Sequence, residues 1–191
     1  MARPSGRPIR DEIVDAATRH IQQVGVNGFS YGDIAKELGI KAPSIHHHFP
    51  TKEELVAAVA ADYRARFGAI VDAIPDGPVV DRIHAYAEVF TDTAKNDRLC
   101  LAGAVSAEWL NIGERPRAEV NAFFVSQQKW LEEELANGVN NGDIALTLPI
   151  PAVAATLFAA LQGSLLLSRA GGANNLPTKS GNVIAALLVA T

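Results

Sequence analysis

Five polar side chains in the first third of the chain lie within eight residues of one another and are suited to hydrogen bonding. They are Lys41, Ser44, His46, His47 and His48. In a helix over this segment, only Ile45 and Phe49, four residues apart, are expected to face inward. A short helix with so few apolar contacts and an outer face rich in donors and acceptors suits the major groove of DNA.

The three successive histidines also allow a metal-site interpretation, and with it an enzyme. A metal-dependent hydrolase would use His46, His47 and His48 as ligands. Consecutive residues on a helix point about 100° apart, so three in a row cannot converge on one ion. The metal enzyme is therefore a remote alternative, and we predict no metal site and no cofactor. His48 is better explained by packing against the first helix or by capping a backbone group.

The segment from Asp33 to Leu55 predicts the helices that would position these side chains. One apolar stripe is formed by Ile34, Ala35 and Leu38. Gly39 stands where a helix end needs a left-handed residue, and Pro43 fits the first turn of the next helix without losing a backbone hydrogen bond. The pattern indicates two short helices joined by a glycine turn and followed by a third helix.

Capping residues mark where the second and fourth helices begin. Ser30 can cap the second helix, with Asp33 three residues later as the acidic relative of the capping box. Thr51 and Glu54 match the full capping-box pattern and start a long helix that reaches about Ile74. The fourth helix should therefore carry the chain out of the N-terminal region.

A longer set of positions in this region matches a known pattern at fixed spacing. The positions are Gly25, Gly28, Ser30, Asp33, Ile34, Ala35, Leu38, Gly39, Ile40, Pro43, Ser44, Ile45, His46, His48, Phe49, Lys52, Glu53 and Leu55. They resemble the N-terminal signature of TetR-family (TetR/AcrR type) transcriptional regulators over about residues 9 to 67. Two positions depart from it: His46 stands where the family usually has Tyr, and Ala42 where Ser or another polar residue is common.

The resemblance implies a helix-turn-helix head and a helical body that binds a ligand and forms a dimer. It also implies that Ser44, His46 and Lys52 contact DNA phosphates, which set the register of a protein on the duplex. Lys41 and His47 are our candidates for contacts with base edges. The DNA-binding candidates are Arg7, Ser30, Tyr31, Lys41, Ala42, Pro43, Ser44, His46, His47 and Lys52.

Charge is divided unevenly along the chain. The net charge is −4, but residues 1–67 hold nine Lys and Arg against eight Asp and Glu, whereas residues 68–191 hold eight against thirteen. The excess acid therefore lies in the second part of the chain. Arg3, Arg7 and Arg10 have few acids near them, and such an arm either follows the phosphate backbone or minor groove of DNA or remains a solvated tail.

Apolar residues recur at helical spacing throughout, without a convincing strand pattern, so we predict an all-α protein. A three-helix head over residues 1–50 should precede a larger ligand-binding and dimerisation body over residues 51–191. Later helices are expected at about residues 79–95, 98–111, 117–138, 150–169 and 176–189. The body shows no Ser/His/Asp arrangement, phosphate-binding glycine loop or HExxH motif, so we do not expect an enzyme.

Composition indicates a globular cytoplasmic protein. Hydrophobic residues make up 48% of the chain and charged residues 20%, and the single cysteine excludes an internal disulfide. The N-terminal basic residues are not followed by an apolar run, which argues against a signal peptide. The longest apolar stretch, Ile150 to Leu167, is shorter than the roughly 20 residues that cross a bilayer. We therefore interpret it as a buried helix and expect no membrane association.

The body contains large aromatic residues of the kind that line ligand pockets, although core packing explains most of them. The ligand-binding candidates are Tyr86, Phe90, Cys100, Trp109, Phe123, Phe124, Trp130, Phe158 and Gln162. Cys100 has a second interpretation, because a thiol near a helix N-terminus and a basic residue can react with electrophiles or oxidants. The simpler alternative for Cys100 is a small buried hydrophobic residue.

The last two helices carry more apolar surface than a monomer should expose, which predicts a dimer interface. Its candidate residues are Leu157, Leu161, Leu165, Ile184, Leu187 and Leu188. The complete hypothesis is a homodimeric repressor that a small apolar or aromatic ligand releases from a pseudo-palindromic operator. The alternatives are a thiol-based sensor acting through Cys100, an activator or ligand-independent regulator, and the remote metal enzyme.

Overall fold

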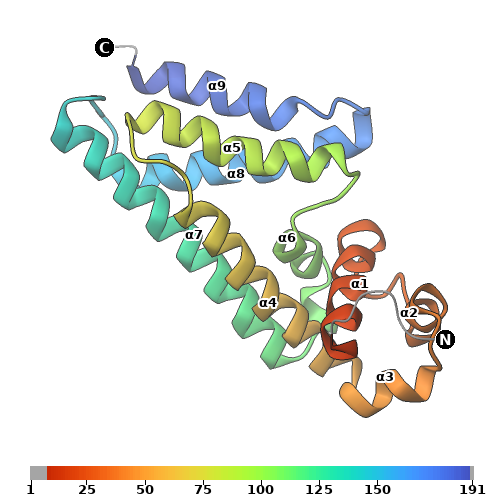
Figure 1. Ribbon diagram of the computed structural model, residues 1–191. Coiled ribbons are helices and arrows are strands. Elements are labelled where there is room, and N and C mark those ends of the chain that lie inside the picture. Colours follow the sequence, from red (N-terminus) through yellow and green to blue (C-terminus); the bar gives the residue numbers. More distant parts are fainter. Residues whose placement is uncertain (1–7, 190–191) are drawn as a thin grey trace. The chain divides into compact units, whose positions relative to one another are not determined.

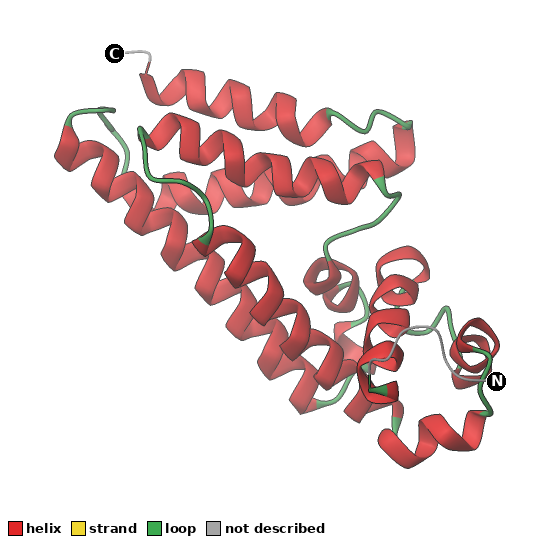
Figure 2. Cartoon of the chain, viewed as in Figure 1, coloured by secondary structure: helices red, strands yellow, loops and turns green. Residues whose placement is uncertain are grey.

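The computed structural model describes residues 8–189, and every regular element in that range is helical (Figures 1 and 2). The elements are α1 (Ile9–Val24), α2 (Tyr31–Leu38), α3 (Ala42–His48), α4 (Lys52–Asp72), α5 (Val79–Lys95), α6 (Leu101–Ser106), a 3-10 helix (Trp109–Asn111), α7 (Glu114–Asn141), α8 (Ile150–Gly171) and α9 (Leu176–Val189). The prediction of an all-α protein is confirmed.

The chain divides into two compact units. The first contains Met1–Arg66 and Leu101–Asn121, and the second contains Phe67–Cys100 and Ala122–Thr191. The first unit thus holds α1 to α3, most of α4, and α6 with the start of α7. We call the first unit the head and the second unit the body. The predicted boundary at residue 50 stays a prediction.

In the head, α2 packs against α1 and α3, as its capping and turn residues predict. Ser30 and Asp33 form the capping box: the Ser30 backbone N–H donates to Asp33 Oδ2 at 2.8 Å, and the Asp33 N–H donates to Ser30 Oγ at 3.3 Å. Gly39 ends α2 in the left-handed region, with φ of 64°. Thr51 Oγ1 accepts the Glu54 N–H at 3.2 Å and so caps α4.

The expected continuous helix over residues 98–111 is interrupted in the structure. Only Leu101–Ser106 is α-helical, and a single 3-10 turn follows at Trp109–Asn111. Glu108, between these two segments, has φ of −109° and ψ of 23°. Its carboxylate accepts backbone N–H groups of the loop after α1.

In the body, α5, α8 and α9 lie side by side, as Figure 1 shows. Their shared core includes the fully buried Tyr86, Ile83 and Leu161. Gly181 of α9 permits a close approach to α5, because a Cβ atom there would lie 2.5 Å from the Ala87 Cβ. The smallest side chain is therefore required at this crossing.

The structure shows that most of the predicted dimer-interface residues are buried within the single chain. Leu157 and Leu161 are fully buried within the body, and Leu165 is 1% exposed. Leu188 is also buried, whereas Leu187 is 69% exposed and Ile184 is half-buried. These four buried leucines are core residues of the protomer, in which α5, α8 and α9 pack against one another. The exposed apolar residues of the two helices are Leu166, Leu167, Val183 and Leu187.

Helix α8 is longer and less buried than expected. It extends over 22 residues, and its length and composition alone would let it cross a membrane. Only a third of its most apolar window is buried within the described chain. The core helix of a soluble protein passes the same test, so this one helix is weak evidence for membrane insertion.

Candidate functional site

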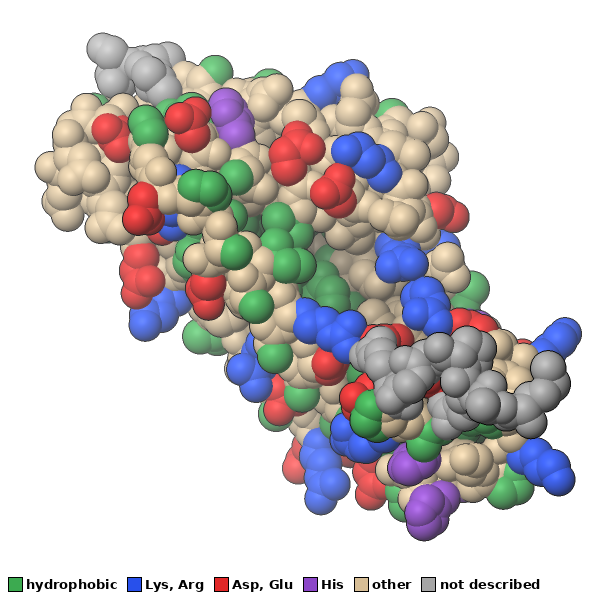
Figure 3. Space-filling view, viewed as in Figure 1, with side chains coloured by type: hydrophobic (Ala, Val, Ile, Leu, Met, Phe, Trp, Pro, Cys, Tyr) green, Lys and Arg blue, Asp and Glu red, His purple; other side chains and the backbone are tan. Residues whose placement is uncertain are grey.

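Helix α3 presents a polar face that two buried side chains hold in place. Ile45 is fully buried and Phe49 is 2% exposed, as their spacing predicts. Lys41, His46 and His47 are exposed, and Figure 3 shows histidine side chains on the head surface. The predicted DNA-contact residues on or next to α3 that the solvent reaches are Lys41, Ala42, Pro43, Ser44, His46 and His47.

Tyr31 supports this face from the first position of α2. Its hydroxyl donates to the Phe49 backbone oxygen at 2.9 Å, and its ring packs edge-on against His46 with centroids 4.6 Å apart. Burial, and then the negative charge of Glu54, raise the pKa of Tyr31 to about 12. The hydroxyl therefore stays protonated, and its proton is used within the head. The DNA-binding role of Tyr31 stays a prediction, and in this structure its O–H group already donates to Phe49.

Lys52 is partly committed to the head itself. Its ammonium donates to the Phe29 backbone oxygen at 2.6 Å and lies 4.2 Å from the centre of the Phe29 ring. Burial lowers the pKa of Lys52. An ammonium has three donors, so two remain beyond this bond. The predicted phosphate contact therefore remains available to a side chain that is already oriented.

The remaining candidates are Ser30 and the arginines of the predicted N-terminal arm. Ser30 is exposed, but its hydroxyl is used in the capping box, where it also lies 2.7 Å from Asp33 Oδ2. Arg3 and Arg7 of the predicted arm lie outside the described residues. Arg10, at the start of α1, lies with its guanidinium 5.0 Å from the centre of the Phe49 ring.

Glu108 is a structural residue of the head that sequence reasoning missed. Its carboxylate accepts the Val26 N–H at 2.5 Å and the Asn27 N–H at 3.1 Å, and it also accepts the Asn27 side-chain amide. The two donating residues follow Gly25, which ends α1 and has φ of 80°. The contact joins positions more than eighty residues apart, so no pattern of neighbouring residues predicts it. It fastens the segment after α6 to the loop before α2.

We predict that Glu108→Ala lowers the free energy of unfolding by about 1–3 kcal/mol, because it leaves the part-buried Val26 N–H without an acceptor and removes the bonds to Asn27. Chemical denaturation of the full chain measures this loss. Asp72→Ala, which removes an exposed acid at the end of α4, is the control and should change stability by less than about 0.5 kcal/mol. Equal stabilities for the two variants would contradict the structural role of Glu108.

Most of the predicted ligand-binding aromatics lie in one cluster of the body. Tyr86 stacks on Trp130 with centroids 4.9 Å apart, and edge contacts continue from ring to ring. The cluster residues are Phe67, Tyr86, Phe90, Phe123, Phe124, Trp130 and Phe158. Phe67 of α4 was not among the candidates, although it is an aromatic residue on a long helix like the others. Trp109 belongs to the head unit, where it is 39% exposed beside Arg117.

Three of the ligand-binding candidates in the body, Tyr86, Cys100 and Gln162, carry a polar group or a thiol. The Tyr86 hydroxyl donates to Gln127 Oε1 at 3.1 Å, and burial, together with a smaller effect of Cys100, holds the pKa of Tyr86 well above its usual value. Cys100 is 2% exposed, so the thiol is shielded from solvent. The side-chain nitrogen of Gln162 is buried and has no hydrogen-bond partner among the described residues. Such a group favours a ligand or water that can pair with it.

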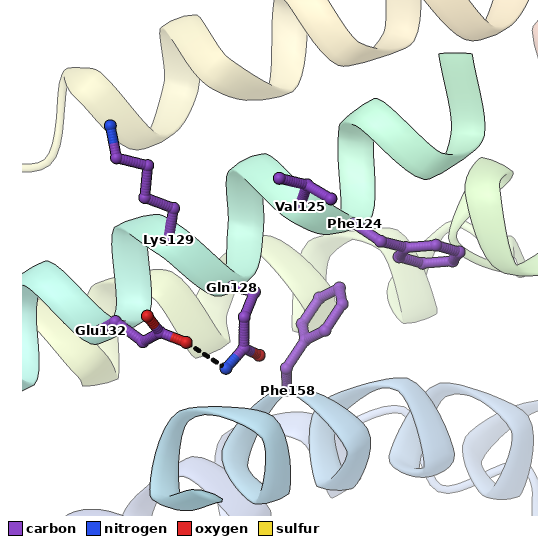
Figure 4. A pocket seen from close by; sticks show the side chains of 6 residues that line it. All are labelled: Phe124, Val125, Gln128, Lys129, Glu132 and Phe158. Carbon is purple, nitrogen blue, oxygen red and sulfur yellow. Dashed lines mark hydrogen bonds between the residues drawn. The ribbon is translucent and has the colours of Figure 1, made fainter. Parts of the chain in front are cut away.

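An open hollow lies where the aromatic cluster meets the surface, and we call it the α7–α8 hollow. It measures about 590 Å³, and its lining is Phe124, Val125, Gln128, Lys129 and Glu132 of α7 with Phe158 of α8 (Figure 4). Phe124 and Phe158 contact one another with ring centroids 5.9 Å apart. Two of the predicted ligand-binding residues thus line a cavity of ligand size.

The three histidines do not form a metal site in this conformation. Among the described residues, no three His, Cys, Asp or Glu side chains are arranged so that they could hold a metal ion. His46 turns to Tyr31, whereas His47 contacts His48 with ring centroids 5.3 Å apart. The divergence expected for consecutive helical residues accounts for this arrangement.

Comparisons with known proteins agree with the geometry of the head and with the fold of the whole chain. The model of bacterial regulatory proteins of the tetR family matches residues 13–59. Tetracycline repressor protein class D of Escherichia coli is 32% identical over 57 residues, which cover 30% of this chain and 26% of the repressor. The matched stretch therefore spans about a quarter of that relative's length.

Solved structures extend the similarity to the body. A TetR-family transcriptional regulator from Agrobacterium tumefaciens has a TM-score of 0.90 at 28% identity, over 95% of this chain and 97% of that chain. The transcriptional regulator FadR from Bacillus subtilis, solved in complex with stearoyl-CoA, has a TM-score of 0.71 at 18% identity, over 94% and 97% of the two chains. The second likeness shows a shared fold.

Proposed function

Because this chain belongs to the TetR family of bacterial transcriptional regulators, we propose that it is a homodimeric repressor that a small apolar or aromatic ligand releases from its operator. The observation that carries the proposal is the exposed donor face of α3, held by the buried Ile45 and Phe49 within the stretch that the family model matches. The protein acts in the cytoplasm, on double-stranded DNA, and is not an enzyme.

The dimer interface is formed by the outer faces of α8 and α9. Leu166, Leu167, Val183 and Leu187 are between 58% and 69% exposed in the single chain. Exposed leucines and valines on two adjacent helices favour burial against a second copy. A two-fold axis would place two copies of α3 about one helical turn of DNA apart, roughly 34–36 Å, on a pseudo-palindromic operator.

The aromatic cluster supports a ligand-responsive body. A ligand that binds the DNA-incompetent conformer more tightly shifts the population away from DNA. A hundredfold loss of operator affinity requires roughly 2.7 kcal/mol of coupling, which one buried aromatic ligand can supply. FadR from Bacillus subtilis, which shares this fold, was solved in complex with stearoyl-CoA. The thiol-based alternative through Cys100 is less favoured, because the side chain is almost fully buried.

The test is to find the promoter fragment that the purified protein protects, and then the compounds that release it. A protected pseudo-palindrome and release by non-reactive apolar compounds are the expected results. An electrophile that releases wild type but not Cys100→Ser, with no effect of non-reactive compounds, would establish the thiol mechanism instead. Failure to bind any promoter fragment would overturn the proposed function.

We predict that Lys52→Ala weakens binding to every DNA sequence and lowers the salt slope of log affinity by about one, because one phosphate contact is lost. Fluorescence anisotropy at several salt concentrations measures both quantities. Lys95→Ala, in an exposed pair with Asp92 on α5, is the control and should leave the slope unchanged. A parental slope for the Lys52 variant would contradict the phosphate assignment.

We predict that His47→Ala changes the preference among operator variants rather than the general affinity for DNA. His47 is exposed on α3, where its ring contacts His48, and an exposed ring nitrogen can meet a base edge. Competition between operator variants with single base changes measures the preference. A variant that loses affinity equally for all sequences would place His47 on the phosphates.

A further inference from the structure

The α7–α8 hollow combines an apolar floor with hydrogen-bond acceptors. Phe124 and Phe158 supply the aromatic surface, and the charged and amide groups come from Gln128 and Glu132, one and two turns further along α7. In Figure 4 the Gln128 and Phe158 side chains point toward one another, and the Glu132 carboxylate lies beside the Gln128 amide. An aromatic surface next to a carboxylate has the chemistry that recognises organic cations.

The hydrogen bonds of Gln128 determine which of its groups remains for a ligand. Its amide nitrogen donates to Glu132 Oε1 at 2.8 Å and to the Pro151 backbone oxygen at 3.0 Å. Both N–H donors are therefore used, and the carbonyl oxygen remains on the side of Phe158 (Figure 4). The second carboxylate oxygen of Glu132 also remains. The polar groups left to a ligand on this side of α7 are acceptors.

The one cation in the lining does not neutralise this site. Lys129 forms an ion pair with Glu133 at 3.4 Å, and Glu133 does not line the hollow. Figure 4 shows the Lys129 side chain extending away from Glu132 and Phe158. The charge of Lys129 is thus offset by its neighbour, and the negative charge of Glu132 faces the hollow.

We propose that the α7–α8 hollow binds amphipathic organic cations. An ammonium group lies against the Glu132 carboxylate and the Gln128 carbonyl oxygen, and an aromatic or aliphatic body lies on Phe124 and Phe158. The volume of about 590 Å³ suits a ligand of two or three rings. The binding step stands independently of DNA, whereas its role as the releasing signal rests on the proposed repressor function.

Isothermal titration of the full chain with three probes of one shape tests the binding step. The probes are 1-naphthylmethylammonium, 1-naphthylmethanol and 1-naphthylacetate, which share the 1-naphthylmethyl group. We expect the cation to bind at least tenfold more tightly than the alcohol, and the anion to bind most weakly. Equal affinities for the cation and the alcohol would overturn the proposal.

Two neighbouring substitutions locate the charge that is responsible. Glu132→Gln keeps an acceptor for the Gln128 amide but removes the charge, so the preference for the cation should fall about tenfold. Glu133→Gln is the matched control, because it removes an equal charge one residue away and outside the hollow. It should leave the preference unchanged, and an equal loss in both variants would overturn the site in favour of a general surface charge. Thermal unfolding verifies that both variants are folded.

Release of the promoter fragment by the same cation separates this inference from the proposed function. Release that Glu132→Gln weakens, but Glu133→Gln does not, supports the hollow as the effector site. Cation binding without release supports the binding site and removes its regulatory role. If the protein binds no promoter fragment, the repressor proposal fails, and the titrations still decide whether the cation site exists.

Discussion

Leu161→Glu should prevent the body from folding, whereas Leu166→Glu should leave a folded chain that no longer dimerises. Leu161 is fully buried inside the protomer, and Leu166, five residues along the same helix, is 58% exposed. An uncompensated carboxylate in the core costs several kcal/mol, a large part of the roughly 5–15 kcal/mol that stabilises a typical domain. The same carboxylate on the outer face remains hydrated until two protomers meet.

Circular dichroism and sedimentation velocity distinguish the two outcomes. Leu161→Glu should lose its cooperative thermal transition, whereas Leu166→Glu should keep a helical spectrum and sediment as a monomer. Leu110→Glu is the control, because Leu110 is 89% exposed in the head unit and should affect neither property. A folded dimer of Leu166→Glu that resists dilution would place the interface elsewhere.

Local sequence signals were sufficient to predict helices α1 to α3 and the start of α4. A capping box, a left-handed glycine and a proline near a helix start each act within a few residues, so Ser30, Gly39 and Pro43 could be interpreted without knowing the fold. The apolar spacing of Ile45 and Phe49 likewise predicted which side of α3 is buried, and the structure confirms it. How the head meets DNA stays a prediction.

The apolar pattern of α8 could not determine which face points inward. Leucines at 161, 165, 166 and 167 surround the helix on several sides, so hydrophobicity alone does not distinguish the core from an interface. The packing of α8 against α5 and α9 determines which of these leucines are buried. The presence of an aromatic side chain also did not indicate where it lies. Trp109 and Trp130 are both tryptophans on predicted helices, but Trp109 belongs to the head and Trp130 to the body.

Contacts between distant segments were also beyond a sequence interpretation. Glu108 accepts hydrogen bonds from the loop at Val26, and Lys52 donates to Phe29, although neither pair shows a local signal. Lys52 was expected to contact phosphate, and the structure adds a bond within the head that orients it. The Arg82–Glu134 pair of the body is a third example, because the two residues are 52 positions apart.

Arg82 joins three parts of the body through one guanidinium. It donates to both carboxylate oxygens of Glu134, at 2.5 and 2.9 Å, and to the backbone oxygens of Ile74 and Pro75 at 3.0 and 2.7 Å. The side chains of Arg82 and Glu134 are only 14% and 11% exposed. The start of α5, the C-terminal half of α7 and the loop after α4 are thereby connected.

Glu134→Ala should lower the free energy of unfolding by about 3–5 kcal/mol, because it leaves a largely buried guanidinium with only the fully exposed Asp76, at 3.3 Å, as a counter-ion. Urea denaturation measures the loss. Glu133→Ala on the same helix breaks only the exposed pair with Lys129 and should cost less than about 1 kcal/mol. The double variant Arg82→Met with Glu134→Leu should recover most of the stability, because apolar residues of similar size avoid the desolvation of two charges. Similar losses for Glu134→Ala and Glu133→Ala would show that the pair contributes no more than a surface ion pair.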